Sequence, residues 1–132
     1  MIALDTKALV RALVDDDPKQ AALAIALISR GMANGETFFV SDIVICEVVW
    51  VLSVSYKIDR TRIASLLRDL LRASHLQFRA RDELFRALNA FGIGKGDFSD
   101  YLIREHASSA GADTVATFDK VLLREAGFMS VR

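Results

Sequence analysis

Cysteine, net charge and long apolar runs are scarce or absent in this sequence. Its single cysteine, Cys46, excludes a disulfide within the chain and fits a reducing cytoplasm. No apolar stretch approaches membrane-spanning length, and the apolar run at the start is too short for a signal peptide. Seventeen basic and seventeen acidic side chains cancel, so nucleic-acid binding would need a local basic surface. These absences predict a soluble cytoplasmic protein without a membrane partner.

The residues that are present describe one folded domain. The chain has 132 residues, of which 52% are hydrophobic and 26% charged, so it can bury a core and is unlike a disordered chain. Its aromatic residues are mostly phenylalanine, which suits a core better than a stacking platform. No repeat, low-complexity segment or linker divides it. We therefore expect a single domain over residues 1–132.

Two short apolar runs each end in an aspartate. Residues 1–4 lead into Asp5, and residues 115–118 lead into Asp119. Each run has the length and composition of a buried strand, which would place its aspartate at the carboxyl end. Sites in open parallel sheets form beyond the carboxyl ends of the strands. Both acids are therefore candidates for one site.

Segments typical of strands and of helices alternate along the chain. Apolar spacing and capping signals predict helices over residues 6–14, 18–31, 43–56, 60–73, 81–91, 97–110 and 120–125. Strands are predicted over residues 1–4, 37–40, 75–78, 115–118 and 128–131. This alternation indicates an α/β fold in which helices cover a central parallel sheet.

Three stretches have both a structural and a functional interpretation. Asp15–Asp17 looks like a metal site, but Asp17 before Pro18 is also a typical helix N-cap, which we prefer. The arginines of the predicted helix 60–73 form a polar face that is either solvated or in contact with RNA. Gly92–Gly96 is either a connector or a loop that faces the substrate, and it lacks the spacing of a phosphate loop.

Glu47 lies where a carboxylate is costly. It falls within the apolar stripe predicted for helix 43–56, which consists of Ile43, Val44, Trp50, Val51 and Val54. A carboxylate on a core-facing stripe needs a partner. Glu47 either reaches outward from the edge of the stripe or serves a site. The large apolar residues on both sides favour the site.

Asp97 and Asp100 complete a set of five acids. They lie three residues apart in the first turn of a predicted helix, and so on one face. If they meet Asp5, Glu47 and Asp119 in one crevice, these carboxylates cannot all stay ionised without counter-charge. Oxygen ligands without His or Cys suit Mg²⁺ or Mn²⁺. A pair of such ions held by carboxylates is the usual apparatus for phosphodiester cleavage.

Each acid also has a structural alternative. Asp97 is either an N-cap or a metal ligand, Asp100 could pair with Arg104, and Asp119 could cap the helix after it. Asp5 has the weakest alternative, because an acid that ends an apolar strand so early in the chain has no evident structural task. The acids are therefore more informative together than separately.

Four motifs occur in order along the chain: Ile2–Thr6, Ile45–Leu52 with Glu47, Asp97–Ile103 and Thr117–Asp119. Together they resemble the PIN-domain family, specifically the VapC-type toxins of toxin–antitoxin pairs. The resemblance spans nearly the whole chain, and the ordered set is more specific than any one motif. It implies a PIN-like three-layer α/β/α sandwich with a central parallel sheet.

The resemblance also implies a Mg²⁺- or Mn²⁺-dependent endoribonuclease. Asp5, Glu47, Asp100 and Asp119 fall on the family's acidic quartet, with Asp97 as an accessory acid and with Thr6 and Thr117 as supporting residues. Members of the family commonly form homodimers and are silenced by a cognate antitoxin that covers the active-site groove. RNA, a second copy and an antitoxin are therefore the expected partners.

The chain departs from the family at Lys7, where the family usually has Asn two residues after the first acid. The Lys7 ammonium could pair with a carboxylate and compete with the metal, contact a substrate phosphate, or weaken activity. Two hypotheses therefore remain open. The chain is either a metal-dependent ribonuclease toxin or a catalytically weakened PIN-like module that binds RNA or protein.

Overall fold

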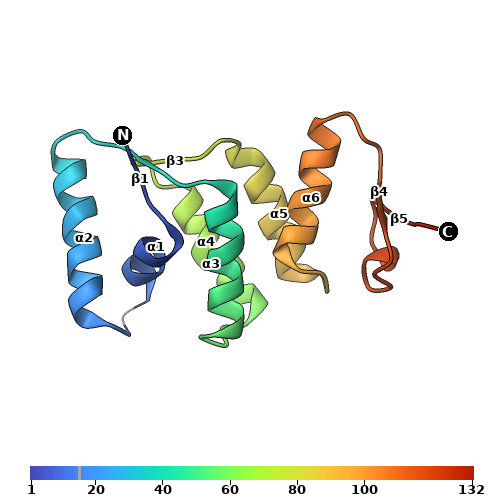
Figure 1. Cartoon of the computed structure of the whole chain (residues 1–132), viewed down its shortest axis with the longest axis horizontal. Helices are drawn as coiled ribbons and strands as arrows, with labels where there is room; N and C mark the ends of the chain where they lie inside the picture. The colour runs from blue at the N-terminus through green and yellow to red at the C-terminus, as the bar shows by residue number, and fades with distance from the viewer. Residues whose placement is uncertain (15) are drawn as a thin grey trace. The chain divides into compact units, whose positions relative to one another are not determined.

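The computed structural model describes residues 1–14 and 16–132, in which helices and strands alternate as predicted (Figure 1). The elements in chain order are β1 (Ile2–Ala3), α1 (Thr6–Leu13), α2 (Pro18–Ala33), β2 (Phe38–Phe39), α3 (Asp42–Val54), α4 (Arg60–Leu71), β3 (Leu76–Gln77), α5 (Arg81–Ile93), α6 (Phe98–Ser109), β4 (Val115–Thr117), the 3₁₀ turn η1 (Leu122–Arg124) and β5 (Phe128–Ser130). Across the described ranges, no helix combines the length and the apolar character needed to cross a membrane.

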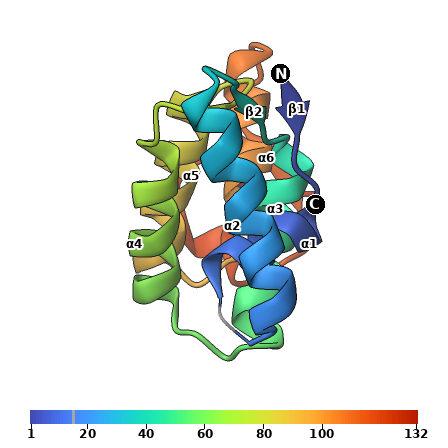
Figure 2. The same ribbon diagram turned by 90° about the vertical axis from the view of Figure 1, so that its left-hand side faces the viewer.

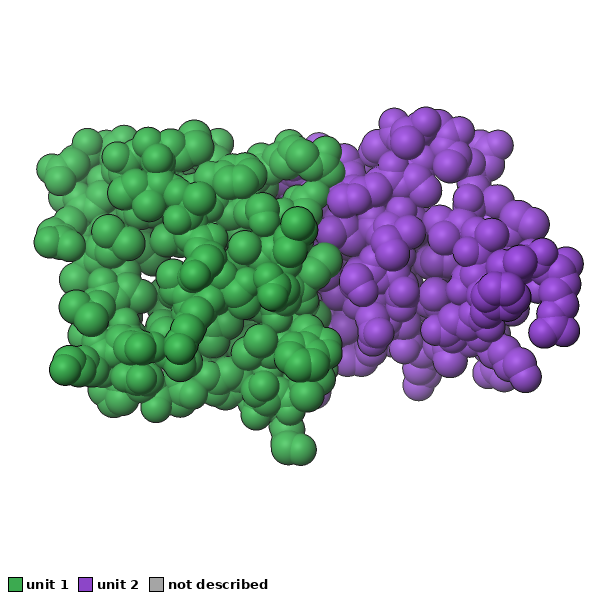
Figure 3. Space-filling model, in the orientation of Figure 1, with its two compact units in different colours: residues 1–57, 70–79 green, residues 58–69, 80–132 purple. Residues whose placement is uncertain are grey.

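The chain forms two compact units, each built from two separate stretches of sequence (Figure 3). Unit 1 comprises Met1–Lys57 and Leu70–Arg79, and unit 2 comprises Ile58–Asp69 and Ala80–Arg132. Unit 1 contains a three-stranded parallel sheet in the order β1-β2-β3, and unit 2 contains the parallel pair β4-β5. The α/β class and the parallel pairing of the strands are thus confirmed. The single domain over residues 1–132 stays a prediction.

The sheet of unit 1 is buried at its middle strand. Phe38 on β2 and Val40 just after it have no exposed surface, and α1 packs against both α2 and α3 (Figure 2). β1 has a paired neighbour on one side only, and Ile2 is 39% exposed. The prediction of a buried strand was therefore wrong for the two residues of β1 and right for Leu4 after it.

Strand β4 is likewise less buried than predicted. Its central residue Ala116 is exposed, Val115 and Thr117 are half-buried, and Phe118 after it is 74% exposed. The reason is the same as for β1, because β4 pairs only with β5 in its sheet.

Helix α3 buries a different face from the predicted one. Ile43, Trp50 and Val54 are 71%, 63% and 53% exposed, and Glu47 on the same face is also exposed. The predicted core-facing stripe was wrong, because most residues of this helix are apolar and their spacing does not select a face. The residues that α3 does bury are Ile45, Val48, Val49 and Leu52.

Helices α5 and α6 pack side by side in unit 2 (Figure 1). Both have a buried apolar face, and the rings of Phe91 and Phe98 meet edge to face with centroids 6.4 Å apart. Gly111 follows the end of α6 with a φ of +91°, a conformation that favours glycine. This turn leads the chain from α6 to β4.

The predicted caps are present at three helix starts. Asp17 caps α2 immediately before Pro18, and Ser41 caps α3. The Asp59 carboxylate accepts the N–H of Arg62 at 2.9 Å, in the first turn of α4. Local capping chemistry was therefore sufficient to place these boundaries.

The run of aspartates before α2 has structural partners where it is described. Asp15 lies outside the described residues. Asp16 accepts a hydrogen bond from the Tyr56 hydroxyl at 2.6 Å, and Asp17 accepts the N–H of Gln20 at 3.1 Å. These bonds support the interpretation of the run as a capped helix start.

Gly31 allows α2 to approach the sheet of unit 1, which gives a test of the packing. A Cβ at this position would overlap Cζ of Phe38 and lie 2.8 Å from its Cε2. We expect Gly31→Ala to lower the free energy of unfolding by about 1–3 kcal/mol, although alanine ordinarily stabilises a helix relative to glycine. Urea denaturation measures the change.

The Gly31→Ala/Phe38→Leu double variant is the control, because a smaller side chain at position 38 makes room for the new methyl group. It should lose less stability than the two single variants lose together. A Gly31→Ala variant as stable as the wild type would contradict the predicted overlap.

Candidate functional site

Asp5 follows β1 and caps α1. Its backbone is extended, and its Oδ1 accepts the N–H of Ala8 at 2.9 Å. The view that Asp5 has no structural task was wrong, because the tight connection from β1 to α1 leaves helix N–H groups that need an acceptor. The side chain is exposed, and its Oδ2 has no hydrogen-bond partner within the described ranges.

Thr6 joins Glu47 to the segment that carries Asp5. The Thr6 hydroxyl donates to Oε1 of Glu47 at 3.0 Å, which connects the first residue of α1 to α3. The structure therefore brings Glu47 against the residue that follows Asp5. Glu47 is exposed, so its carboxylate keeps its contact with water and does not need a buried partner of opposite charge.

Lys7 lies in the first turn of α1 and is exposed. Over residues 1–14 and 16–132, its ammonium forms no ion pair with a carboxylate. One of the possibilities raised by the sequence, a lysine that pairs with an acid of the site, is thus not seen.

Cys46, next to Glu47 on α3, does not provide a nucleophile. Burial raises the pKa of its thiol to about 11, and the nearby carboxylates of Asp42 and Glu47 add to the rise. The thiol therefore stays protonated at neutral pH, and the reactive form of cysteine is the thiolate.

In unit 2, Asp97 and Asp100 form the start of α6. Asp97 is the N-cap, and its backbone N–H donates to Oδ2 of Asp100 at 3.0 Å. This is the arrangement in which the third helical residue reaches back to the cap. Arg104, the alternative partner of Asp100, donates instead to the carbonyl oxygen of Ala126 at 2.8 Å.

Asp119 is held at the end of β4 by two backbone bonds. Its N–H donates to the Thr117 hydroxyl at 3.0 Å, and its Oδ1 accepts the N–H of Val121 at 2.8 Å. The carboxylate thus caps the turn before η1, as its structural alternative proposed. Thr117 acts on the backbone of Asp119 and so fixes the position of the acid.

The pKa of the Asp100 carboxyl is raised above its ordinary value. Burial raises the pKa of its carboxyl most, and the negative charges of Asp97, Asp119 and Glu125 raise it further. The hydrogen bond from the Asp97 N–H acts in the opposite direction. Three predicted acids of unit 2 therefore influence one another, and negative charge gathers around Asp100.

Glu125 belongs to this group but was not predicted. Its Oε2 accepts a hydrogen bond from the Tyr101 hydroxyl at 2.6 Å. No sequence signal marked it, because it lies in the short segment between η1 and β5 and its partner is 24 residues away.

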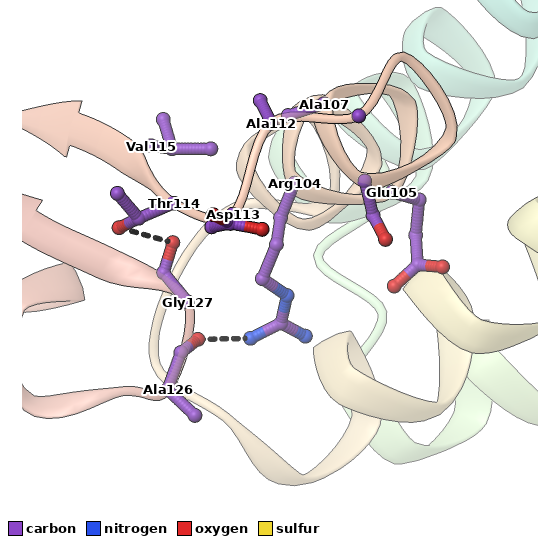
Figure 4. Close-up of a pocket in the computed structure, with 11 residues that line it drawn as sticks. Arg104, Glu105, Ala107, Ala112, Asp113, Thr114, Val115, Ala126 and Gly127 are labelled. Atoms are coloured by element: carbon purple, nitrogen blue, oxygen red, sulfur yellow. Dashed lines mark hydrogen bonds between the residues drawn. The ribbon is translucent and has the colours of Figure 1, made fainter.

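A pocket of about 540 Å³ in unit 2 does not contain the predicted acids (Figure 4). It is lined by the second half of α6, the connection to β4, and Ala126 and Gly127. Arg104 and Thr114 donate to the carbonyl oxygens of those two residues. Asp100 lies in the first turn of α6, so this pocket is not the candidate site.

The acids do not form a complete metal cluster within the described residues. No group of three or more His, Cys, Asp or Glu side chains is placed to hold a metal ion there. Asp5 and Glu47 belong to unit 1, and Asp97, Asp100 and Asp119 belong to unit 2. The predicted meeting of all five acids stays a prediction.

Comparison with protein families identifies the class of this α/β chain. The model of the PIN domain matches residues 2–128. The chain therefore belongs to the PIN domain family. PIN domains are generally nucleases and typically use divalent metal ions. No curated protein matches the sequence.

The raised pKa of Asp100 predicts how the stability of the metal-free protein depends on pH. A carboxyl with a raised pKa in the folded state contributes stability below its unfolded pKa, about 3.9, and loses it as the pH rises through the folded value. We expect Asp100→Asn to raise the free energy of unfolding at pH 7 in EDTA, because it removes a negative charge that the folded state disfavours. Below a pH of about 4 this gain should shrink, because Asp100 is then protonated in the wild type as well.

Denaturation in urea at both pH values measures this difference. Asp113→Asn, at an exposed aspartate of the same unit, is the matched control for a change of net charge. A loss of stability in Asp100→Asn at pH 7 would show that the hydrogen bond to the Asp97 N–H outweighs the crowding of charge.

Proposed function

We propose that this PIN domain is a Mg²⁺- or Mn²⁺-dependent endoribonuclease that depends on Asp5, Glu47, Asp100 and Asp119. The observation that carries the proposal is the gathering of carboxylates around Asp100, whose pKa is raised by burial and further by these neighbouring charges. A divalent cation would offset this negative charge. The other donors are also oxygen atoms, which Mg²⁺ and Mn²⁺ prefer.

The carboxylates would hold the metal, and other residues would keep them in place. Asp5, Asp100 and Asp119 each use one oxygen to accept a backbone N–H. Asp97 fixes Asp100 through its N–H, and Thr6 and Thr117 fix Glu47 and Asp119. A metal held by these carboxylates would supply activation of a water and stabilisation of the leaving oxygen in phosphodiester cleavage.

Cleavage of RNA tests this proposal. The wild type should cleave a total RNA pool in Mg²⁺ or Mn²⁺ and stop in EDTA. Asp5→Asn, Glu47→Gln, Asp100→Asn and Asp119→Asn should each reduce the rate by about 100-fold or more, because each removes an electrostatic group needed in the transition state. Mapping the cut sites by sequencing measures both rate and specificity.

Asp113→Asn is again the control and should leave the rate unchanged. If the wild type cleaves no RNA with either metal, the enzyme proposal is wrong. The alternative is then a weakened PIN-like module that binds RNA or protein. The Lys7 position is the observation in the sequence that favours this alternative.

We further propose that the chain is the toxin of a VapBC-type module and that its partners are an antitoxin and a second copy of itself. Exposed apolar side chains support this. Helix α2 buries Ala21 but exposes Leu23, Ile25 and Met32 at 65%, 51% and 49%. Helix α4, by contrast, uses Ile63, Leu67 and Leu71 in the core, so its apolar residues leave little surface for a partner.

The exposed apolar side chains of α2 and α3 suit two different partners. Trp50 lies between Ile43 and Val54 on the exposed face of α3, and tryptophan is enriched at the centre of protein interfaces. We assign this face to the second copy, because a stripe centred on one aromatic residue can pair with itself across a two-fold axis. The exposed apolar side chains of α2 are assigned to the antitoxin.

Light scattering tests the dimer. The protein should have twice the mass of the 14.6 kDa chain, and Trp50→Glu should shift it to a monomer. Leu23→Glu on α2 is the matched control and should leave the dimer intact. A monomeric wild type, or a dimer that survives Trp50→Glu, would contradict this assignment.

A further inference from the structure

Arg60 makes three contacts with the end of α5 and the loop after it. Its Nε donates to the carbonyl oxygen of Phe91 at 3.0 Å, and its Nη2 donates to the carbonyl oxygen of Gly96. Its guanidinium carbon lies 4.2 Å from the centre of the Phe91 ring. This combination uses the planar fork of arginine, which lysine lacks. Arg60 is thus half-buried and turned toward its own unit, not part of a solvated face.

Tyr101 holds the same loop from α6. Its hydroxyl accepts the N–H of Gly96 at 2.9 Å and donates to Glu125, and its side chain has no exposed surface. A Cβ on Gly96 would lie 2.6 Å from Cδ2 of Leu122, and a Cβ on Gly94 would lie 2.8 Å from Oε1 of Glu125. The two glycines therefore serve close packing. The segment Gly92–Gly96, predicted to be a connector or a loop that faces the substrate, is held at both polar backbone atoms of Gly96.

One peptide unit connects this loop to Asp100. The carbonyl of Gly96 and the N–H of Asp97 are two ends of a single planar peptide. The carbonyl accepts from Arg60, and the N–H donates to Oδ2 of Asp100 at 3.0 Å. A rotation of this peptide would break both bonds. A cationic donor on the carbonyl also polarises the peptide and strengthens its N–H as a donor.

We propose, resting on the nuclease function proposed above, that Arg60 and Tyr101 are positioning residues for Asp100. Arg60 fixes the Gly96–Asp97 peptide, and Tyr101 fixes the Lys95–Gly96 peptide directly before it. The N–H of the Gly96–Asp97 peptide in turn fixes one oxygen of the Asp100 carboxylate. The other oxygen is then presented in a constant orientation to a divalent cation. Neither residue touches the metal or the substrate in this assignment.

Amide hydrogen exchange in the metal-free protein tests the link from Arg60 to Asp100. Arg60→Gln and Asp100→Ala should each speed exchange of the Asp97 amide by about tenfold or more, as expected for the loss of a hydrogen bond to a charged group. The Arg60→Gln/Asp100→Ala double variant should exchange no faster than the faster single variant, because both changes act on the protection of the same Asp97 N–H. The buried Leu88 amide on α5 reports global opening and should not change.

Arg68→Gln is the matched control. Arg68 is on the same helix and in the same unit, and it donates to Oδ1 of Asn89 at 3.1 Å. Its loss should leave the Asp97 amide as protected as in the wild type. Equal exchange in Arg60→Gln and Arg68→Gln, or effects that multiply in the double variant, would overturn the proposal.

Binding of Mn²⁺ alone, followed by the paramagnetic signal of the free ion, tests the consequence for the site. Arg60→Gln and Tyr101→Phe should weaken Mn²⁺ affinity by about 10- to 100-fold, the range typical of residues that orient metal ligands. Cleavage at saturating Mn²⁺ should return close to the wild-type rate, which a role in the chemistry itself would not allow. Unchanged Mn²⁺ affinity in both variants would overturn the positioning role.

Tyr101→Phe also serves if Arg60→Gln does not fold, since it keeps the buried ring and removes only the hydroxyl. It should speed exchange of the Gly96 amide while leaving Leu88 protected. If the wild type neither binds Mn²⁺ nor cleaves RNA, the nuclease function fails. The exchange measurements still decide, independently, whether Arg60 holds Asp100.

Discussion

Backbone N–H groups at the starts of helical turns hold the acids of this protein in place. The carboxylates of Asp5, Asp100 and Asp119 each accept one such N–H, at 2.8 to 3.0 Å. A helix start needs an acceptor, and a carboxylate has two oxygens to offer. Within the described ranges, the second oxygen of each acid has no hydrogen-bond partner. Capping and metal binding are therefore compatible uses of one side chain, although the sequence presents them as alternatives.

In this arrangement the ionised form of Asp100 is disfavoured by its surroundings. Its hydrogen bond from the Asp97 N–H favours the ionised form, yet burial and neighbouring carboxylates raise its pKa. A fold selected for stability alone would not gather Asp97, Asp119 and Glu125 around it. In a family of nucleases that typically use divalent metals, such crowding is the expected consequence of a site whose counter-charge arrives with the metal.

The sequence predicts the elements of this fold well because their signals are local. Asp17 before Pro18, Ser41 and Asp59 mark helix starts through chemistry that acts within three residues. The prediction of which face α3 buries was wrong, because an almost wholly apolar helix carries no periodic signal. The prediction that β1 and β4 are buried was also wrong. The burial of a strand depends on its neighbours in the sheet, and the sequence of one strand does not reveal these neighbours.

The contacts of Arg60 could not be predicted from the sequence, for a different reason. Its partners are the backbone carbonyls of Phe91 and Gly96, and a carbonyl has no residue type to recognise. Glu125 was missed because its link to Tyr101 spans 24 residues. The sequence thus marks the candidate acids by residue type and position, but it does not reveal the backbone contacts that surround them.

Lys7 shows how the same reasoning bears on the one departure from the family. It lies in the first turn of α1, where the helix dipole disfavours a cation, and that turn has no acidic residue. Its ammonium is exposed and forms no ion pair in the part of the chain that is described. Lys7 therefore contributes nothing evident to the stability of α1. An exposed ammonium two residues along the chain from Asp5 is accessible to a substrate phosphate.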